Sequence, residues 1–225
     1  MDSNDVSSRV AVLAGASGLV GSECLRLLLD SANYHLVMAL VRRPLQVAHP
    51  KLRQLKVDFA RLPRLSEFAG ADVFSALGTT MSQAGSREAF RKVDFDATLS
   101  FATIAAQCRA RQFVMVSSIG ADAHSPTFYL KVKGELEDAL KSLSFSSLHI
   151  FRPSFLAGDH LGNSPGERVS AAVTQALDFS LVGKLKKFSA IDAADLAAAM
   201  LNAALRAVPG AHVYEYEQIL ELAKS

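Results

Sequence analysis

The sequence is poor in cysteine and in metal-ligand clusters, and each shortage excludes a class of protein. Its 225 residues include only two cysteines, Cys24 and Cys108, each inside a segment that reads as an apolar helix. This usage suits a reducing compartment better than a disulfide framework. The six histidines are scattered, and no Cys or His cluster has ligand spacing. We therefore expect no metal site, structural zinc included.

Long basic and long apolar runs are also missing. The 24 lysines and arginines nearly balance 22 acidic residues, which leaves no electrostatic footprint for nucleic acid or an anionic membrane surface. The longest early stretch without charge, Val10 to Ser22, is shorter than the roughly 18 apolar residues that span a bilayer. The acidic start Met1 to Asp5 indicates no secretory signal. We expect a soluble, cytoplasmic protein that acts on a small molecule, with homo-oligomerisation left open.

Short apolar runs alternate with segments of helical period along the chain. The runs are continuous, as is typical of strands buried on both faces, and predict strands at 10–14, 35–41, 52–59, 72–77, 112–117 and 148–151. Between them, helices are expected at 19–29, 64–68, 87–109, 129–140 and 169–179. This order predicts an α/β fold, a doubly wound parallel sheet with helices on both faces.

The last third of the chain is less regular. It predicts an alanine-rich helix at 191–207, a late strand at 211–217 and a terminal helix at 219–223. We interpret this region as a small C-terminal covering subdomain of a single domain. That domain spans residues 1–225, with one half at about 9–150 and the substrate-covering part at about 151–225.

A glycine-rich turn follows the first expected strand and leads into the first expected helix. Glycines at spacing three and three let the chain turn sharply, approach a pyrophosphate and pack the helix on the strand. The N–H groups at the helix start then bind the phosphates. The turn predicts dinucleotide binding, and packing alone is the alternative. Its binding residues would be Gly15, Ser17, Gly18, Leu19, Val20 and Gly21.

Arg42 and Arg43 follow the second expected strand, where NAD enzymes usually place an acidic residue on the ribose 2′-hydroxyl. Guanidinium groups cannot accept that hydrogen bond, but they match a 2′-phosphate in charge and geometry. NADP(H) is therefore favoured over NAD(H), and two solvated surface arginines are the alternative. Asp58 and Phe59, which close the third strand, fall where side chains can reach the adenine. A turn-capping Asp58 is an equal alternative.

Tyr129 and Lys133 lie four residues apart, on one face of an expected helix. A nearby ammonium group stabilises a phenolate, which makes a tyrosine usable as an acid or base near neutral pH. Ser117 and Ser118 leave the C-terminal end of the fifth strand, the edge where ligands bind in open parallel sheets. A serine there can donate a hydrogen bond to a substrate carbonyl. The alternative is that two serines at the end of a strand only form a turn or cap a helix.

In this order and over this length, the motifs resemble those of an atypical, NAD(P)-binding short-chain dehydrogenase/reductase. The narrower resemblance is to the Tat-interacting-protein oxidoreductase branch, and it runs from about residue 9 to 205. It is carried by Gly15 to Gly18, Arg42-Arg43, Val57-Asp58-Phe59, Ala76 to Thr80, Ser117 to Asp122, Tyr129 to Glu135 and Phe151-Arg152-Pro153. The resemblance implies a Rossmann fold, with NADPH at the glycine turn and the arginine pair.

The resemblance also implies individual roles. Tyr129 would be the acid or base, Lys133 would bind the nicotinamide ribose, and Ser118, with Ser117 as the fallback, would orient the carbonyl. Further cofactor contacts would come from Leu77, Gly78, Thr79, Pro153 and Phe155. The asparagine that many of these enzymes add to the catalytic set has no clear match, because Asp94 and Asp96 lie on the relevant helix instead.

These observations predict an NADPH-dependent oxidoreductase that transfers hydride to or from a small carbonyl or alcohol substrate. One alternative is a regulatory or sensor protein that binds NADPH without turnover. A sugar-nucleotide epimerase is the third possibility. It is disfavoured because the chain after residue 151 is short for a nucleotide-sugar subdomain.

Overall fold

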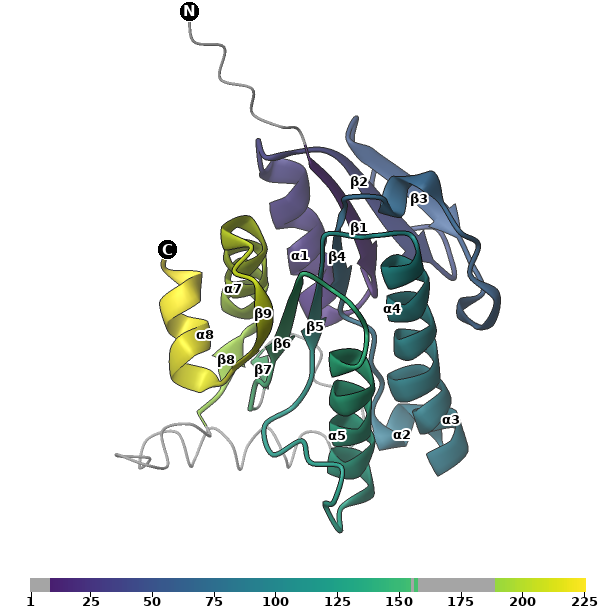
Figure 1. Cartoon of the computed structure of the whole chain (residues 1–225), viewed down its shortest axis with the longest axis vertical. Helices are drawn as coiled ribbons and strands as arrows, with labels where there is room; N and C mark the ends of the chain where they lie inside the picture. Colours follow the sequence, from purple (N-terminus) through teal and green to yellow (C-terminus); the bar gives the residue numbers. More distant parts are fainter. Residues whose placement is uncertain (1–8, 155, 158–188) are drawn as a thin grey trace, which may run out of the picture.

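The protein is described by a computed structural model, over residues 9–154, 156–157 and 189–225 (Figure 1). Seven parallel strands form one sheet in the order β3-β2-β1-β4-β5-β6-β9. They are β1 (Arg9–Ala14), β2 (Tyr34–Val41), β3 (Leu52–Lys56), β4 (Asp72–Ser75), β5 (Gln112–Val116), β6 (Ser147–Phe151) and β9 (Gly210–Tyr214). The strand order reverses between β1 and β4, which confirms the predicted doubly wound Rossmann-type fold.

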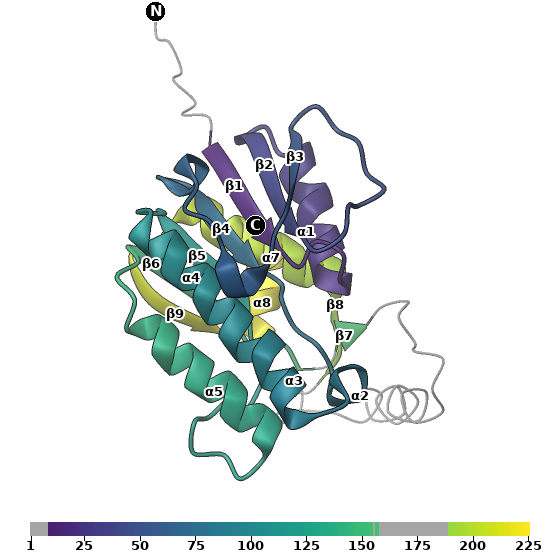
Figure 2. The same ribbon diagram turned by 90° about the vertical axis from the view of Figure 1, so that its right-hand side faces the viewer.

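Helices cover both faces of the sheet (Figure 2). One face carries α1 (Leu19–Asp30), α7 (Ala193–Arg206) and α8 (Tyr216–Ala223), and the other carries α4 (Thr98–Gln107) and α5 (Phe128–Lys141). Within β1, Leu13 packs toward α1 and α7, whereas Val12 packs toward α4 and α5. Both strand faces are therefore buried, which explains the continuous apolar runs in the sequence.

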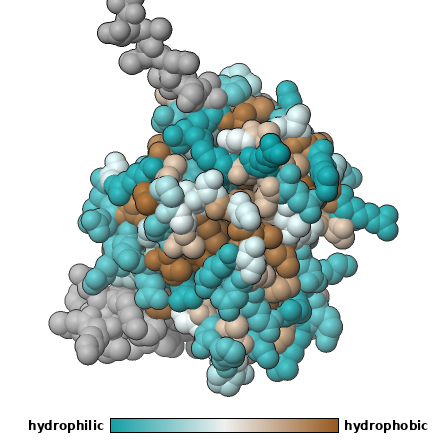
Figure 3. All heavy atoms as spheres, viewed as in Figure 1, coloured by the Kyte–Doolittle hydropathy of each residue, from teal (hydrophilic) through white to brown (hydrophobic). Residues whose placement is uncertain are grey.

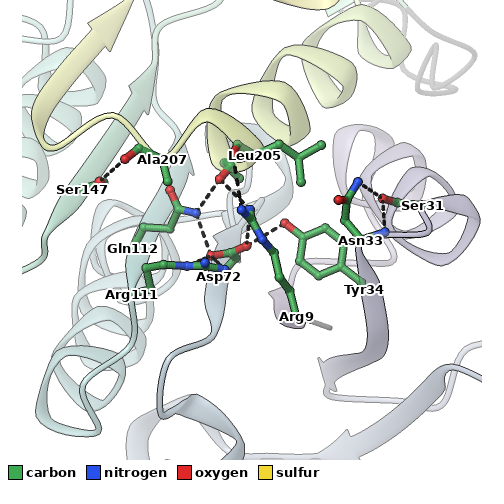
Figure 4. A network of polar contacts seen from close by, with 11 residues as sticks. Arg9, Ser31, Asn33, Tyr34, Asp72, Arg111, Gln112, Ser147, Leu205 and Ala207 are labelled. Carbon is green, nitrogen blue, oxygen red and sulfur yellow. Dashed lines mark hydrogen bonds and ion pairs between the residues drawn. The ribbon is translucent and has the colours of Figure 1, made fainter. Parts of the chain in front are cut away.

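A buried polar network lies at the amino ends of the strands (Figure 4). The Asp72 carboxylate accepts hydrogen bonds from the Tyr34 hydroxyl at 2.8 Å, Arg111 Nε at 2.8 Å and Gln112 Nε2 at 2.7 Å. Arg9 pairs with Asp72 at 3.5 Å and donates to a carbonyl in the last turn of α7 at 3.2 Å. The network therefore ties four strands to the C-terminal end of α7.

Three predicted elements differ from the observed ones, and at two of them a side chain caps the turn. The strand expected at 52–59 ends at Lys56, because Asp58 caps a 3-10 turn at Phe59–Arg61. The helix expected at 64–68 is only a 3-10 turn, Ser66–Phe68. The strand expected at 211–217 ends at Tyr214, because Glu215 and Gln218 form a capping box that starts α8.

The long helix expected at 87–109 is divided into three parts. It begins as α3 (Arg87–Arg91), passes through a π-helical segment (Lys92–Ala97), and continues as α4. A short helix, α2 (Met81–Ala84), precedes it. The division matters for the site because the π-helical segment carries a buried aspartate, Asp94.

The C-terminal region builds part of the main sheet. Residues 189–225 supply β9 as the seventh strand, and α7 packs against α1. The helix expected at 191–207 begins only at Ala193, because β8 (Ile191–Asp192) pairs with β7 (Leu156–Ala157). The helix expected at 169–179 lies outside the described residues, so a substrate-covering part there stays a prediction.

On the face seen in Figure 1, hydrophilic side chains surround a central group of hydrophobic ones (Figure 3). Four large apolar side chains of the described residues are well exposed, and they come from four separate segments: Val47, Met81, Leu156 and Val208. Scattered exposure of this kind is normal for a protein surface. None of the helices that the structure describes is both long and apolar enough to cross a membrane.

Candidate nucleotide-binding and catalytic site

The turn between β1 and α1 requires glycine at two positions. Gly15 has φ +88°, and a Cβ there would overlap the Ala76 carbonyl oxygen. A Cβ at Gly21 would overlap the Gly15 carbonyl oxygen. The Gly18 amide donates to that same oxygen at 3.0 Å, which closes the turn. The glycines therefore allow close approaches between backbone segments, as the spacing predicted.

The start of α1 is suited to an anionic group. Gly18 is the N-cap and offers no side-chain hydrogen bond, and the first turn has no acidic residue. The first N–H groups of a helix have no intrahelical partner, and they carry the positive end of its dipole. Ser17 is exposed, whereas Val20 is buried, so that only the backbone of Val20 is suited to ligand contact. These features fit the pyrophosphate of a dinucleotide.

The arginine pair lies at the carboxyl end of β2. Arg42 and Arg43 are both exposed, and neither forms an ion pair with another described residue. Asp58 is exposed too, and its carboxylate accepts a hydrogen bond from the Ala60 amide at 3.0 Å. Phe59 is buried against Phe101, with ring centroids 6.3 Å apart. Asp58 thus serves as a turn cap, and adenine contacts from Asp58 and Phe59 stay predictions.

Tyr129 and Lys133 lie together on α5. Lys133 Nζ is 5.9 Å from the centroid of the Tyr129 ring, and the half-buried tyrosine packs on Phe90 at 5.5 Å. Lys133 Nζ also lies 2.7 Å from Asp94 Oδ1 in an ion pair whose side chains are only 6% and 1% exposed. This arrangement buries one lysine charge beside one carboxylate.

The segment after β4 lies against this ion pair. Leu77 packs into the apolar layer beneath α4, and Gly78 is exposed. A Cβ at Gly78 would lie 3.6 Å from Asp94 Oδ1 and 4.0 Å from Lys133 Nζ. The Thr79 amide donates to Asp94 Oδ2 at 2.9 Å. The predicted cofactor segment 77–79 and the predicted catalytic lysine are thus brought together through Asp94.

The two serines have different surroundings. Ser117 is buried, and its hydroxyl donates to Glu137 Oε1 at 2.5 Å. Glu137 in turn accepts two hydrogen bonds from Arg152, at 3.0 and 2.6 Å. Hydrogen bonding to Glu137 raises the pKa of Arg152 above its ordinary value. Ser118 is only partly buried, and within the described residues its hydroxyl makes one long contact, 3.4 Å to the Ile119 carbonyl. Of the two serines, Ser118 is therefore better suited to bind a ligand.

A glycine on α5 sets the distance between the helix and the serine loop. A Cβ at Gly134 would overlap the Ala123 amide nitrogen, so that α5 packs directly on the backbone of the loop. The Asp122 amide donates to the Leu130 carbonyl at 3.2 Å. A glycine inside an amphipathic helix is costly, which is the sequence signal that could have identified this contact.

The loop after β6 completes the described part of the site. Pro153 is buried, and its carbonyl accepts a hydrogen bond from the Ile119 amide at 2.9 Å. Phe155 lies outside the described residues. Sequence reasoning assigned no role to Glu137 and none to Arg152 beyond its place in a motif. Glu137 lies on α5 and Arg152 follows β6, so the spacing of residues along the chain does not reveal that they pair.

No metal cluster is found in the part of the chain that the structure describes, since no three His, Cys, Asp or Glu side chains gather there. The two cysteines are free. Burial raises the pKa of the Cys24 thiol to about 12, with a smaller effect from the nearby Glu23 charge. A thiol with so high a pKa is a poor nucleophile.

Comparison with known proteins places these features in a family. Residues 15–205 match the family described as NAD(P)H-binding. The mitochondrial protein FMP52 of Candida albicans is 35% identical over 77% of this chain and 84% of its own. The rat protein HTATIP2 is 36% identical over 72% of this chain and 68% of its own length. The solved structure of human epimerase family protein SDR39U1 with NADPH has a TM-score of 0.58 at 17% identity. The match covers 92% of this chain and 74% of that one.

One expectation is contradicted by these comparisons. Several fungal relatives are named mitochondrial proteins, so the prediction of a cytoplasmic location is wrong. Scarce cysteine does not distinguish one reducing compartment from another. The glycine turn, the sheet order and the sequence matches agree on the family. The chain belongs to the NAD(P)H-binding Rossmann family, in its atypical short-chain dehydrogenase/reductase-like branch.

Proposed function

We propose that this protein is an NADPH-dependent oxidoreductase for a small carbonyl or alcohol substrate. The observation that carries the proposal is the position of Tyr129 beside the buried Lys133–Asp94 pair. That pair lies against Gly78, on the segment that follows β4. The first residue of this segment, Ala76, meets the glycine turn of β1. These contacts support a role for Tyr129 as a proton donor beside the proposed nucleotide site.

In the proposed reaction, the bound cofactor supplies the hydride for the carbonyl carbon. Tyr129 donates its phenolic proton to the carbonyl oxygen, and the product is an alcohol. In the reverse direction Tyr129 accepts the alcohol proton. Ser118 donates a hydrogen bond to the same oxygen and orients it, whereas Ser117 is held by Glu137. Lys133 keeps a positive charge close to the tyrosine and the cofactor ribose.

The activity can be tested with purified full-length protein and a panel of aldehydes, ketones and quinones. We expect NADPH consumption with at least one member, and we expect Tyr129→Phe to reduce kcat at least about 100-fold because the proton donor is lost. Tyr216→Phe on α8 is the matched control and should retain activity. NADPH binding without any turnover would contradict the proposal and would favour the regulatory alternative.

We also propose that Arg42 and Arg43 bind the 2′-phosphate of NADPH. Replacing both by alanine should weaken NADPH binding about 10-fold or more, and NADH binding by less than about 2-fold, because only NADPH carries the phosphate. Both affinities can be measured by isothermal titration. Arg53→Ala, which removes an exposed arginine paired with Glu67, is the control. Equal losses for the two cofactors would refute the assignment.

The names of the fungal relatives support a mitochondrial location for this chain. The full-length chain with a C-terminal fluorescent protein, expressed in yeast, should follow a mitochondrial marker. Diffuse fluorescence throughout the cell would contradict this location.

A further inference from the structure

A π-helical segment interrupts the helix that faces the site. Residues Lys92–Ala97 form this segment between α3 and α4, with helical backbone on both sides. Such segments are rare, and they often occur at functional sites, because the wider turn redirects the side chains that follow. Asp94 is the buried residue of this segment, whereas Asp96, two residues later, is exposed. The irregular turn therefore carries one carboxylate into the interior.

The two carboxylate oxygens of Asp94 each contact a donor, and the two donors come from different segments. Oδ1 lies 2.7 Å from Lys133 Nζ on α5, and Oδ2 accepts a hydrogen bond from the Thr79 amide at 2.9 Å. Among the described residues, Lys133 has no other ion-pair partner. Asp94 is thus the group that connects the catalytic helix to the segment that follows β4.

We propose that Asp94 is a positioning residue, which acts on the cofactor and on Tyr129 through Lys133. The inference rests on the proposed function, because Lys133 is taken to bind the cofactor ribose. A carboxylate neutralises the buried ammonium group and fixes its position, while it also holds the 78–79 backbone against that group. Both residues that Asp94 holds, Lys133 and Thr79, are among the predicted cofactor contacts.

An asparagine cannot replace this carboxylate, although it has nearly the same shape. A carboxylate offers two acceptor oxygens, whereas a carboxamide offers one oxygen and one NH2 donor. Since Lys133 Nζ and the Thr79 amide are both donors, an asparagine would place a donor against one of them. The buried lysine would also lose its neutralising charge. Asp94→Asn is therefore a nearly isosteric test of the carboxylate itself.

The test is a double-mutant cycle on NADPH binding with Asp94→Asn, Lys133→Met and the double variant. Because the chain has no tryptophan, the fluorescence of the reduced nicotinamide reports binding without interference from tryptophan. We expect each single change to weaken NADPH binding about 10-fold, and the double variant to match Lys133→Met within about 2-fold. Asp96→Asn is the matched control and should bind within about 2-fold of the wild type. With a substrate in hand, Asp94→Asn should lower kcat and leave the KM for the carbonyl substrate unchanged.

Two results would overturn the proposal. In the first, Asp94→Asn binds NADPH as tightly as the wild type. In the second, the losses of the two single variants multiply in the double variant, as they would for a structural defect independent of Lys133. If Asp94→Asn does not fold on its own, a double variant that binds NADPH clearly more weakly than Lys133→Met still overturns the proposal. The binding cycle needs no turnover, so a failure of the oxidoreductase proposal would be recognised separately by the carbonyl panel.

Discussion

Gly21 and Gly70 show that a glycine can be required for two different physical reasons. At Gly21, a Cβ would overlap the Gly15 carbonyl oxygen where α1 packs on the glycine turn. At Gly70, φ is +69°, but nothing lies within 4 Å of a Cβ. The first position excludes a side chain by contact, and the second only disfavours the backbone conformation of other residues.

We expect Gly21→Ala to lower the free energy of unfolding by about 3 kcal/mol, because neighbouring backbone would have to move. Gly70→Ala, the control, should cost about 1 kcal/mol from its backbone conformation alone. Urea denaturation of both variants measures the difference. If the two variants were equally stable, close packing of α1 on the turn would not be the reason for Gly21.

His149 is a buried histidine on β6, beside His212 and Tyr214 of β9. Its Nδ1 lies 3.0 Å from the Tyr214 hydroxyl, and its ring stacks on His212 with centroids 5.5 Å apart. Burial, reinforced by the charge of His212, lowers the pKa of His149 to about 4. The folded protein therefore holds this ring neutral at physiological pH.

This lowered pKa predicts an acid-dependent loss of stability. Between about pH 6.5 and pH 4 the histidine binds a proton in the unfolded chain but not in the folded one, so acid favours unfolding. We expect His149 to contribute a loss of about 3 kcal/mol over this range and nothing above it. In His149→Gln that contribution should vanish, as measured by denaturation at several pH values. In His35→Gln, where the histidine is exposed, the wild-type slope should remain.

At the scale of elements, Glu137 joins α5 to two strands. It accepts hydrogen bonds from Ser117 after β5 and from Arg152 after β6. Arg152→Met would leave a buried carboxylate without its cation, and we expect it to lower the free energy of unfolding by about 2 kcal/mol. Chemical denaturation measures this change.

An exposed ion pair provides the control for this prediction. Arg26 pairs with Glu23 and Asp30 on the surface of α1, so Arg26→Met should cost less than about 0.5 kcal/mol. A similar loss in both variants would show that burial of Glu137 does not determine the cost.

Elements defined by local pattern could be predicted from the sequence, and those defined by contact could not. The apolar runs and the glycine turn indicated β1, α1 and β2 to within one residue. The end of β9 was missed although Glu215 and Gln218 form a capping box that the sequence displays. The pairing of β7 with β8 depends on residues 35 positions apart, such as Leu156 and Ile191. Such pairing has no local signal.

In the candidate site, too, features set by local sequence pattern could be predicted and features set by long-range contacts could not. The spacing of Tyr129 and Lys133 was enough to place both on one helical face, and the structure brings them together. Ser117 and Ser118 could not be distinguished, because the partner of Ser117, Glu137, lies twenty residues along the chain. Asp94 was noticed only as a departure from the asparagine pattern. Its pairing with Lys133 depends on the π-helical turn, which the helical period does not reveal.

At the scale of the whole molecule, one end of the sheet carries a stabilising polar network and the other end carries the candidate site. The Asp72 network ties the amino ends of the strands together (Figure 4). The glycine turn, the arginine pair and Tyr129 follow the carboxyl ends of β1, β2 and β5. We expect Asp72→Asn to lower the free energy of unfolding by about 3 kcal/mol and to leave NADPH affinity within about 2-fold. Denaturation and cofactor titration test the two parts. A large loss of affinity in a folded variant would show that the two ends are coupled.

The packing of α7 on α1 also governs when the chain can finish folding during its synthesis. The apolar face of the first helix is covered by a helix that ends at Arg206, and Arg9 reaches a carbonyl 195 residues further along the chain. A ribosome therefore synthesises the segment from Ser31 to Arg206 before α7 is complete and can pack on α1. Until then the part of α1 that α7 covers stays exposed on the nascent chain, and we expect chaperones to bind there.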